Sequence, residues 1–191
     1  MTMDKNYEED RSGIESNTVG VYRTAATVKG GRRFSFSAMI VCGDRQGKVG
    51  LGYGKANQVP NAIEKAQKKA KRAMRPFPLT GTTIPHEVTG RFGACSVRLV
   101  PASPGTGVIA GAAVRAVLDL VGVKDCLSKA YGSTNNKNLT KAVMNGLEQL
   151  RSRKQVEALR KVSIDKTHAE EAHEAVQSTP VETTHAEAAA E

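Results

Sequence analysis

Three closely spaced glycines precede a stretch that the hydrophobic pattern predicts as a helix. Gly105, Gly107 and Gly111 lie within "PASPGTGVIAGAAVRAVLDLVGV", residues 101–123. The free backbone N–H groups at the start of a helix favour an anion, so such a loop could bind a phosphate. The pattern matches neither GxxxxGK[ST] nor GxGxxG, because the third glycine falls one residue late. The sequence therefore leaves open an anion site and a tight turn that allows close packing.

The sequence has no recognisable set of catalytic or metal-binding side chains. His86 is the only histidine before residue 166, and it lies in a predicted strand. No serine or cysteine has a base beside it in a known motif. Three further histidines lack the spacing of a zinc site: His168, His173 and His185. We therefore expect no enzyme, no cofactor and no metal, and a small-molecule kinase with a nucleotide at Gly105–Gly107 is only a third hypothesis.

The three cysteines are Cys42, Cys95 and Cys126, an odd number with wide spacing and no CxxC pair. Such cysteines indicate small core residues in a reducing compartment rather than disulfides or a zinc site. The N-terminus lacks the apolar segment of a signal peptide, and no apolar run is long enough to span a membrane. We expect a cytoplasmic protein with no membrane contact.

The basic residues are concentrated in the middle of the chain. The formal net charge is +9, and residues 19–80 carry thirteen Lys and Arg against two Asp and Glu. Residues 81–165 carry twelve against six, whereas residues 1–18 and 166–191 are net acidic, by three and five charges. A body this basic repels itself unless a polyanion neutralises it. The charge therefore indicates a nucleic acid as the partner.

Two basic segments are candidates for phosphate binding. The segment "KGGRR", residues 29–33, predicts a flexible loop with three cations between two strands. The helix that follows the strands has six cations in eleven residues and only Glu64 to oppose them, so i,i+4 ion pairs do not neutralise it. Lys55, on the strand before this helix, is counted with them. The candidate RNA-binding residues are Lys29, Gly30, Gly31, Arg32, Arg33, Lys55, Lys65, Lys68, Lys69 and Arg72.

Aromatic residues are scarce, with no Trp, four Tyr and four Phe. Phe34 and Phe36 share one face of a predicted strand, where we expect them in the core. Proteins that bind single strands commonly stack bases on aromatic side chains, so this composition is unfavourable for that mode. It favours recognition of structured or double-stranded RNA through phosphates and 2′-hydroxyls.

The first half of the chain predicts three strands followed by a helix. The alternation of apolar residues places the strands at residues 21–28, 34–42 and 48–56. Glycines at positions 50, 52 and 54 leave one face of the third strand bare, which permits close approach by another backbone or by a packed helix. The helix is expected to begin near Pro60 and to run to Arg75. Its apolar stripe is expected to be Ile63, Ala66, Ala70, Ala73 and Met74.

The second half begins beyond "RPFPLTGTT", which a helix cannot cross. It predicts a ββαβα order: a hairpin at residues 84–102, a helix at 108–121, a strand at 123–131 and a helix at 139–151 that Asn138 could cap. The chain thus predicts an α+β fold of two small domains, each a sheet with helices on one face. The expected divisions are a disordered acidic N-terminus at 1–18, domains at 19–80 and 81–165, and a disordered acidic tail at 166–191.

Two long motifs together resemble one known family. They are "VKGGRRFSFSAMIVCGDRQGKVGLGYGKANQVPNAIEKAQKKAKR" and "IPHEVTGRFGACSVRLVPASPGTGVIAGAAVRAVLDLVGVKDCLSKAYGSTN". In this order they resemble the two halves of bacterial small-subunit ribosomal protein five, over residues 19–151. The resemblance implies a double-stranded-RNA-binding-like first domain. It also implies a second domain of a fold that some small-molecule kinases share, here without their longer glycine–serine motif.

The resemblance also implies a function. Members of the family bind small-subunit rRNA, contact ribosomal proteins four and eight, lie near the path along which mRNA enters, and influence decoding accuracy. A loop that matches residues 28–32 is associated with spectinomycin sensitivity, and an accuracy-linked contact with protein four maps onto Gly107 and Arg115. Three positions depart from the family pattern: Ala26, Gln58 and Asn136. The sequence thus predicts a structural rRNA-binding protein of the small subunit; the alternative is a free-standing double-stranded RNA-binding regulator.

Overall fold

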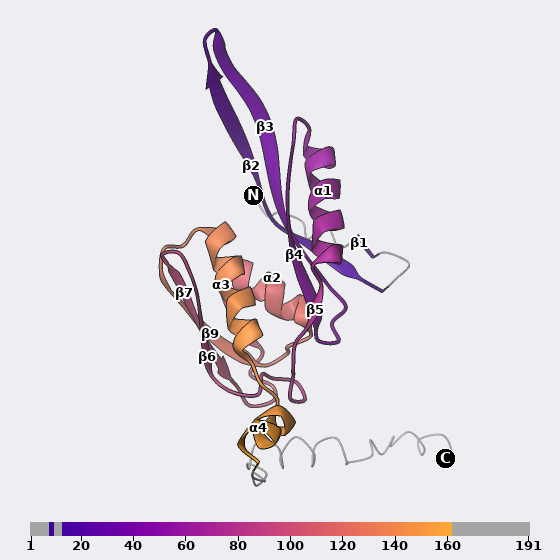
Figure 1. The fold of residues 1–191 in the computed structure, drawn as a ribbon, viewed down its shortest axis with the longest axis vertical. Helices are drawn as coiled ribbons and strands as arrows, with labels where there is room; N and C mark the ends of the chain where they lie inside the picture. The colour runs from indigo at the N-terminus through magenta and orange to yellow at the C-terminus, as the bar shows by residue number, and fades with distance from the viewer. Residues whose placement is uncertain (1–7, 10–12, 162–191) are drawn as a thin grey trace, which may run out of the picture.

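The computed structural model describes residues 8–9 and 13–161, which form two sheets and four helices (Figure 1). The first sheet has the order β1-β2-β3-β4-β5, with strands β1 (Glu8–Glu9), β2 (Glu15–Val28), β3 (Gly31–Gly43), β4 (Lys48–Ala56) and β5 (Arg75–Pro76). The second has the order β6-β7-β9-β8, with strands β6 (Val88–Phe92), β7 (Cys95–Pro101), β8 (Val108–Ile109) and β9 (Cys126–Gly132). The helices are α1 (Val59–Arg72), α2 (Ala112–Val121), α3 (Asn136–Gln149) and α4 (Arg153–Arg160). The expected α+β class is confirmed.

Strands β2 and β3 form a long antiparallel hairpin that extends beyond the rest of the molecule (Figure 1). Their pairing reaches Val28 and Gly31, so only Lys29 and Gly30 remain in the turn. Gly31 has a φ of 146°, a backbone conformation that glycine adopts without the steric cost of a Cβ atom. Residues 29–30 therefore form a tight turn, where the glycine pair in the sequence predicted a flexible loop over residues 29–33.

The N-terminal segment is more ordered than its composition predicted. Within the segment 1–18, for which the sequence predicted disorder, residues 8–9 form β1 and residues 15–18 form the start of β2. Residues 15–18 pair with the far end of β3, a partner that local composition cannot indicate. The tail predicted at residues 166–191 lies outside the described residues.

Helix α1 packs against the bare face of β4, as the alternating glycines predicted. A Cβ atom built on Gly50, Gly52 or Gly54 would lie 2.2, 2.0 or 2.2 Å from a carbonyl oxygen of the helix. Those oxygens belong to the buried stripe of the helix, which is Ala70, Ala66 and Ala62. Small residues on both elements let the two backbones approach directly. This contact fixes the side of α1 that remains exposed.

Two helix boundaries differ from those that the sequence predicted. Helix α1 ends at Arg72, so Ala73 is exposed instead of continuing the buried stripe. The N-cap of α3 is Asn135 and not Asn138, because the Asn135 side chain accepts a hydrogen bond from the N–H of Lys137 at 3.1 Å. The helix therefore begins one turn earlier than expected.

The stretch before α2 also differs from the prediction. The helix expected over residues 108–121 begins only at Ala112. Val108 and Ile109 instead form β8, which pairs in parallel with Cys126 and Leu127 of β9. This pairing joins segments remote in sequence, so the apolar run alone could not reveal it.

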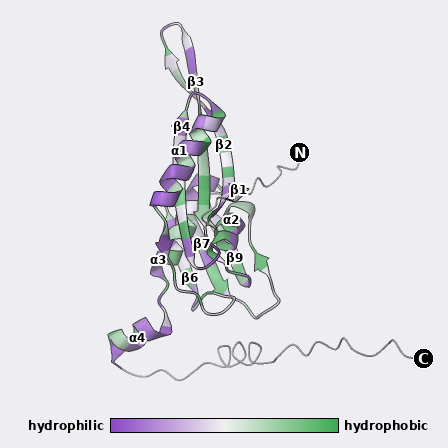
Figure 2. Ribbon diagram, turned by 90° about the vertical axis from the view of Figure 1, so that its right-hand side faces the viewer, coloured by the Kyte–Doolittle hydropathy of each residue, from purple (hydrophilic) through white to green (hydrophobic). Residues whose placement is uncertain are grey.

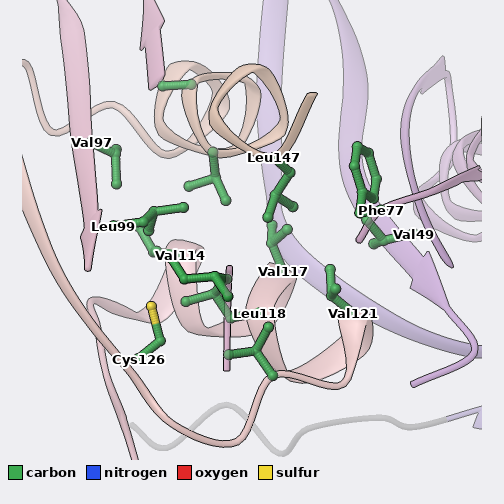
Figure 3. Close-up of a cluster of buried hydrophobic side chains, with 14 of the residues drawn as sticks. Val49, Phe77, Val97, Leu99, Val114, Val117, Leu118, Val121, Cys126 and Leu147 are labelled. Atoms are coloured by element: carbon green, nitrogen blue, oxygen red, sulfur yellow. The ribbon is translucent and has the colours of Figure 1, made fainter. Parts of the chain in front are cut away.

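Both sheets share one hydrophobic core (Figure 3). Val41 and Val49 of the first sheet lie in the same buried cluster as Val117 and Val121 of α2 and Leu147 of α3. The alternate residues of β3 face α1 on the other side of the sheet: Ala38, Ile40 and Cys42. Helices thus cover both faces of the first sheet, which corrects the expectation of helices on one face.

The turn between β3 and β4 is fixed to the end of α2. The N–H of Arg45 donates to the carbonyl of Leu120 at 3.0 Å, and the N–H of Gly47 donates to the carbonyl of Val121 at 2.8 Å. These bonds use carbonyls at the end of α2 that have no partner within the helix. The two halves of the chain are therefore joined by hydrogen bonds as well as by the shared core.

Candidate nucleic-acid interface

A basic groove lies between α1 and β4. Four cations of α1 fall on one side of the helix because their spacing is i, i+3, i+4 and i+7. With two residues of β4 they line a hollow of about 330 Å³. The lining residues are Tyr53, Lys55, Lys65, Lys68, Lys69 and Arg72, which we call the basic groove. The structure thus brings together five of the ten candidate RNA-binding residues.

The five cations of the basic groove are all exposed, and α1 is largely hydrophilic (Figure 2). None of the ion pairs observed within residues 13–161 uses any of these five cations. Arg75, which lies in β5, forms one of those ion pairs with Glu148, at a distance of 2.7 Å. Lys69 and Arg72 lie in the last turn of α1, where the helix dipole favours positive charge. The groove therefore presents uncompensated positive charge to a ligand.

Tyr53 belongs to the groove, although the sequence did not mark it as a site residue. It precedes Lys55 by two positions on β4, so alternation along the strand was the only signal. A hydrogen bond with Ser37, together with the charges of Lys137 and Lys55, lowers the pKa of the Tyr53 hydroxyl. The ammonium of Lys137 lies 5.0 Å from the Tyr53 ring and 4.5 Å from the Tyr22 ring. Lys137 at the start of α3 thus links the second half of the chain to this strand.

The other five candidate residues lie on the β2–β3 hairpin and form a separate basic surface. We call residues 28–33 the hairpin tip; it lies beyond the end of α1 (Figure 1). Lys29, Arg32 and Arg33 are exposed there. A Cβ atom on Gly30 or Gly31 would meet no other heavy atom within 4 Å. The hairpin tip is therefore open on its sides and can approach a phosphate backbone closely.

Phe34 does not lie in the core, so that prediction is wrong. Its side chain is 46% exposed, and the guanidinium of Arg23 lies 3.7 Å from its ring centroid. Phe36 is half-buried. Both follow the apolar alternation of β3, but the hairpin carries Phe34 past the part of the sheet that the helices cover. A guanidinium over an aromatic face is a favourable cation–π contact.

The glycine loop is occupied by a group of the protein itself. The N–H of Gly107 donates to the carboxylate of Asp125 at 2.9 Å, and Asp125 is buried. Gly105 and Gly107 have φ values of 88° and 76°, which glycine tolerates best. Because β8 separates the loop from α2, the free N–H groups of that helix do not belong to it. This geometry favours the tight turn over the phosphate site.

Arg115 lies beside this loop on α2. Its guanidinium donates to the carbonyl of Val108 at 3.1 Å. Val108 directly follows Gly107 in the chain. It also lines a surface hollow of about 510 Å³ together with Arg45, Asp119 and Lys124. The structure therefore brings together Gly107, which is half-buried, and Arg115, which is exposed, the two residues expected at a protein interface.

The described residues contain no group of three or more His, Cys, Asp or Glu that could hold a metal ion. Cys42, Cys95 and Cys126 are all free and buried, as core residues are. Burial raises the pKa of the Cys42 and Cys126 thiols to about 11, which keeps both protonated and unreactive near neutral pH. The three histidines after residue 166 lie outside this region. Between residues 13 and 161, each helix is too short or too polar to cross a membrane.

The fold and the surface together define a small basic α+β protein with a charged groove and a protruding basic hairpin. The model of the ribosomal protein S5 N-terminal domain matches residues 14–78, and that of its C-terminal domain matches residues 90–160. Small ribosomal subunit protein uS5 of Rhodopirellula baltica is 51% identical over 162 residues, which cover 84% of this chain and 92% of that protein. The protein of the same name from Rubrobacter xylanophilus is 54% identical over 153 residues, covering 80% and 76%. The chain belongs to the ribosomal protein S5 family.

Proposed function

We propose that this chain is a structural component of the small ribosomal subunit that binds small-subunit rRNA and supports subunit assembly. The main support for the proposal is the basic groove. Its five exposed cations take part in none of the ion pairs observed among the described residues. Relatives that share about half of its residues are named as small-subunit ribosomal proteins, which supports the same role. In this proposal the protein acts in the cytoplasm as part of the ribosome and catalyses no reaction.

The groove would bind RNA by replacing counterions on phosphates. Each phosphate contact makes the slope of the logarithm of the binding constant against the logarithm of the salt concentration more negative by about 0.7–0.9. Five contacts therefore give a slope of about −4. The hairpin tip would add a second contact, because its cations lie outside the groove and its glycines leave the backbone open. The scarcity of aromatic residues favours recognition of RNA shape over base stacking.

The region of Gly107 and Arg115 would be a protein interface that influences decoding accuracy. The support is geometric: the Asp125 carboxylate fixes the backbone of Gly107, and the Val108 carbonyl fixes Arg115. In this proposal the neighbours are small-subunit proteins four and eight, with protein four at this region and mRNA nearby. A substitution such as Gly107→Arg would then alter decoding accuracy without changing the affinity of the groove for rRNA.

The test uses the full chain in two charge-matched variants. Lys65, Lys68 and Lys69 are changed to Gln in the groove variant, and Lys48, Lys154 and Lys161 in the control variant; all six lysines are exposed. We expect the groove variant alone to lose affinity for small-subunit rRNA, with a salt slope smaller by about 2–3. In sucrose gradients of a lysate, the wild-type chain should sediment with the small subunit and remain there at high salt. Equal losses in both variants would refute the groove as the site, and a chain near the top of the gradient would indicate a free-standing RNA-binding regulator.

A further inference from the structure

A second hollow lies next to the basic groove, where α3 comes close to β4 and to the end of α1 (Figure 1). Leu51 and Ala73 line it from the first half of the chain. Phe92 and Met144 line it from the second half, and we call this space the junction hollow. Its volume is about 340 Å³, at the lower end of the range for pockets that hold small ligands. Because both halves supply the wall, neither sequence motif alone predicts it.

The apolar wall of the junction hollow combines fixed aliphatic side chains with an open aromatic ring. Leu51 and Met144 are half-buried and pack against the core that the two sheets share. Phe92, the last residue of β6, is 41% exposed. The ammonium of Lys141 lies 4.7 Å from the centroid of its ring, a favourable cation–π contact. A flat ligand such as a nucleobase can stack on a ring presented in this way.

The polar side chains of the junction hollow suit a ligand that has hydrogen-bonding edges and negative charge. The side-chain carbonyl of Asn145 accepts from the N–H of Arg91 at 3.3 Å and from a side-chain amide of the same helix at 2.8 Å. These bonds leave the N–H groups of the Asn145 amide to donate to a ligand. Arg75 and Glu148 in the lining neutralise each other as an ion pair. The charge of Lys141 therefore remains, and it favours an anionic ligand.

The junction hollow and the basic groove are neighbours along two elements. Leu51 of the hollow and Tyr53 of the groove lie two positions apart on β4, so they share one face of the strand at a distance of about 7 Å. Ala73 of the hollow directly follows Arg72 of the groove at the end of α1. A nucleotide beside the phosphates that the groove binds therefore reaches the hollow.

We propose that the junction hollow binds the base of one unpaired nucleotide next to an RNA helix held by the basic groove. This inference rests on the proposed function of the groove and adds a feature that the RNA must have. An unpaired base enters at little cost, whereas a paired base must first leave its stack. Phe92 stacks on the base, and Asn145 donates to its edge. One ring is enough for one nucleotide, so the scarcity of aromatic residues, which disfavours binding of longer single strands, does not oppose this contact.

The experiment measures binding of the full chain to three RNAs that differ at one place. The first is a perfect duplex, the second has one unpaired adenosine in the middle, and the third has an abasic nucleotide there. We expect the second RNA to bind about fivefold to thirtyfold more tightly than the other two, as stacking of a single base predicts. The ratio should hardly change with salt, because a base contact releases no counterions. The abasic RNA has the same flexibility and charge, so an equal gain for it would overturn the proposal.

Two variants change the junction hollow in opposite ways. Phe92→Ala removes the ring, and Ala73→Leu fills the space; both residues are exposed, so the core should keep its packing. Each variant should bind the perfect duplex like the wild type but lose the preference for the unpaired adenosine. The matched control is Tyr131→Ala, which removes an exposed aromatic ring of β9 outside the hollow and should keep the preference. A full preference in both hollow variants would overturn the proposal.

The groove variant separates this inference from the proposed function. It should lose affinity for all three RNAs but keep the ratio between them, because phosphate and base contacts then contribute independently. A groove variant that keeps wild-type affinity would refute the proposed function itself. Loss of affinity in the groove variant, beside a wild-type chain that binds all three RNAs equally, would refute only the base site. In that case a side chain of a partner protein would be the better candidate for the junction hollow.

Discussion

Replacing Gly52 by alanine is expected to destabilise the protein strongly, because the added methyl group would meet helix backbone. The new Cβ would lie 2.0 Å from the Ala66 carbonyl oxygen and 2.6 Å from the Ala70 backbone nitrogen, whereas ordinary contacts begin near 3.4 Å. Helix α1 would therefore have to move away from β4 by about 1 Å. The backbones of α1 and β4 approach one another just as closely at Gly50 and Gly54, so the displacement would disturb the packing there as well.

The size of the effect follows from that displacement. Overpacking a core costs about 1–3 kcal/mol and sometimes more, and here no flexible side chain can absorb the strain. We expect a loss of about 3 kcal/mol in the free energy of unfolding. With a urea m-value of about 1–3 kcal/mol per molar, the unfolding midpoint falls by about 1–3 M.

Urea unfolding of the full chain, followed by circular dichroism, measures this loss. The matched control is Gly30→Ala in the hairpin turn, where the new Cβ meets no heavy atom within 4 Å. That control should stay within about 0.5 kcal/mol of the wild type. A Gly52→Ala protein as stable as the control would refute the idea that backbone contact holds α1 on the sheet. The same variant should also lose RNA affinity, because the groove lies between the two elements that separate.

Two further predictions test single residues. Asn135→Ala should lower the free energy of unfolding by about 1 kcal/mol through loss of the α3 N-cap, whereas Asn138→Ala should change it much less; equal losses would contradict the observed cap. The Tyr53 hydroxyl, isolated as the difference between wild-type and Tyr53→Phe absorbance titrations, should ionise at a lower pH in the folded chain than in the unfolded chain. Its ionised form is favoured by the hydrogen bond with Ser37 and by nearby positive charge, so Lys137→Gln should raise the pKa, and an unchanged midpoint would count against that contact.

The sequence predicted best the features that depend on one element and its alternation. Glycine at every second position of β4 predicted a closely packed partner, because a strand face without side chains lets another backbone approach directly. The cations of α1 predicted one exposed basic side, since helical spacing alone determines it. The packing of Ala66 on Gly52 agrees with the first prediction. Four of the six predicted cations line the groove, whereas Arg75 lies in β5, where it pairs with Glu148, and Lys71 does not line the groove.

Features set by remote segments could not be predicted in the same way. The pair Val108–Ile109 fits a helix or a strand equally well, and pairing with β9 decides between them. Phe34 follows the apolar alternation, but the length of the hairpin, and not the alternation, leaves it exposed. The segment "STNNKN" offers several asparagines as helix caps, and only the path of the chain into α3 selects Asn135.

The core shared by the two sheets has a consequence for synthesis of the chain. Residues 15–72 contain β2, β3, β4 and α1, and they are synthesised before α2. Until residues 112–121 emerge, Val41 and Val49 have no helix to cover them, so the nascent first half exposes an apolar strand face. The two regions that match separate domain models share one core, so we expect them to fold as one unit. A fragment that stops before α2 would bind hydrophobic dyes or chaperones, and the native state would follow only when the second half closes over it.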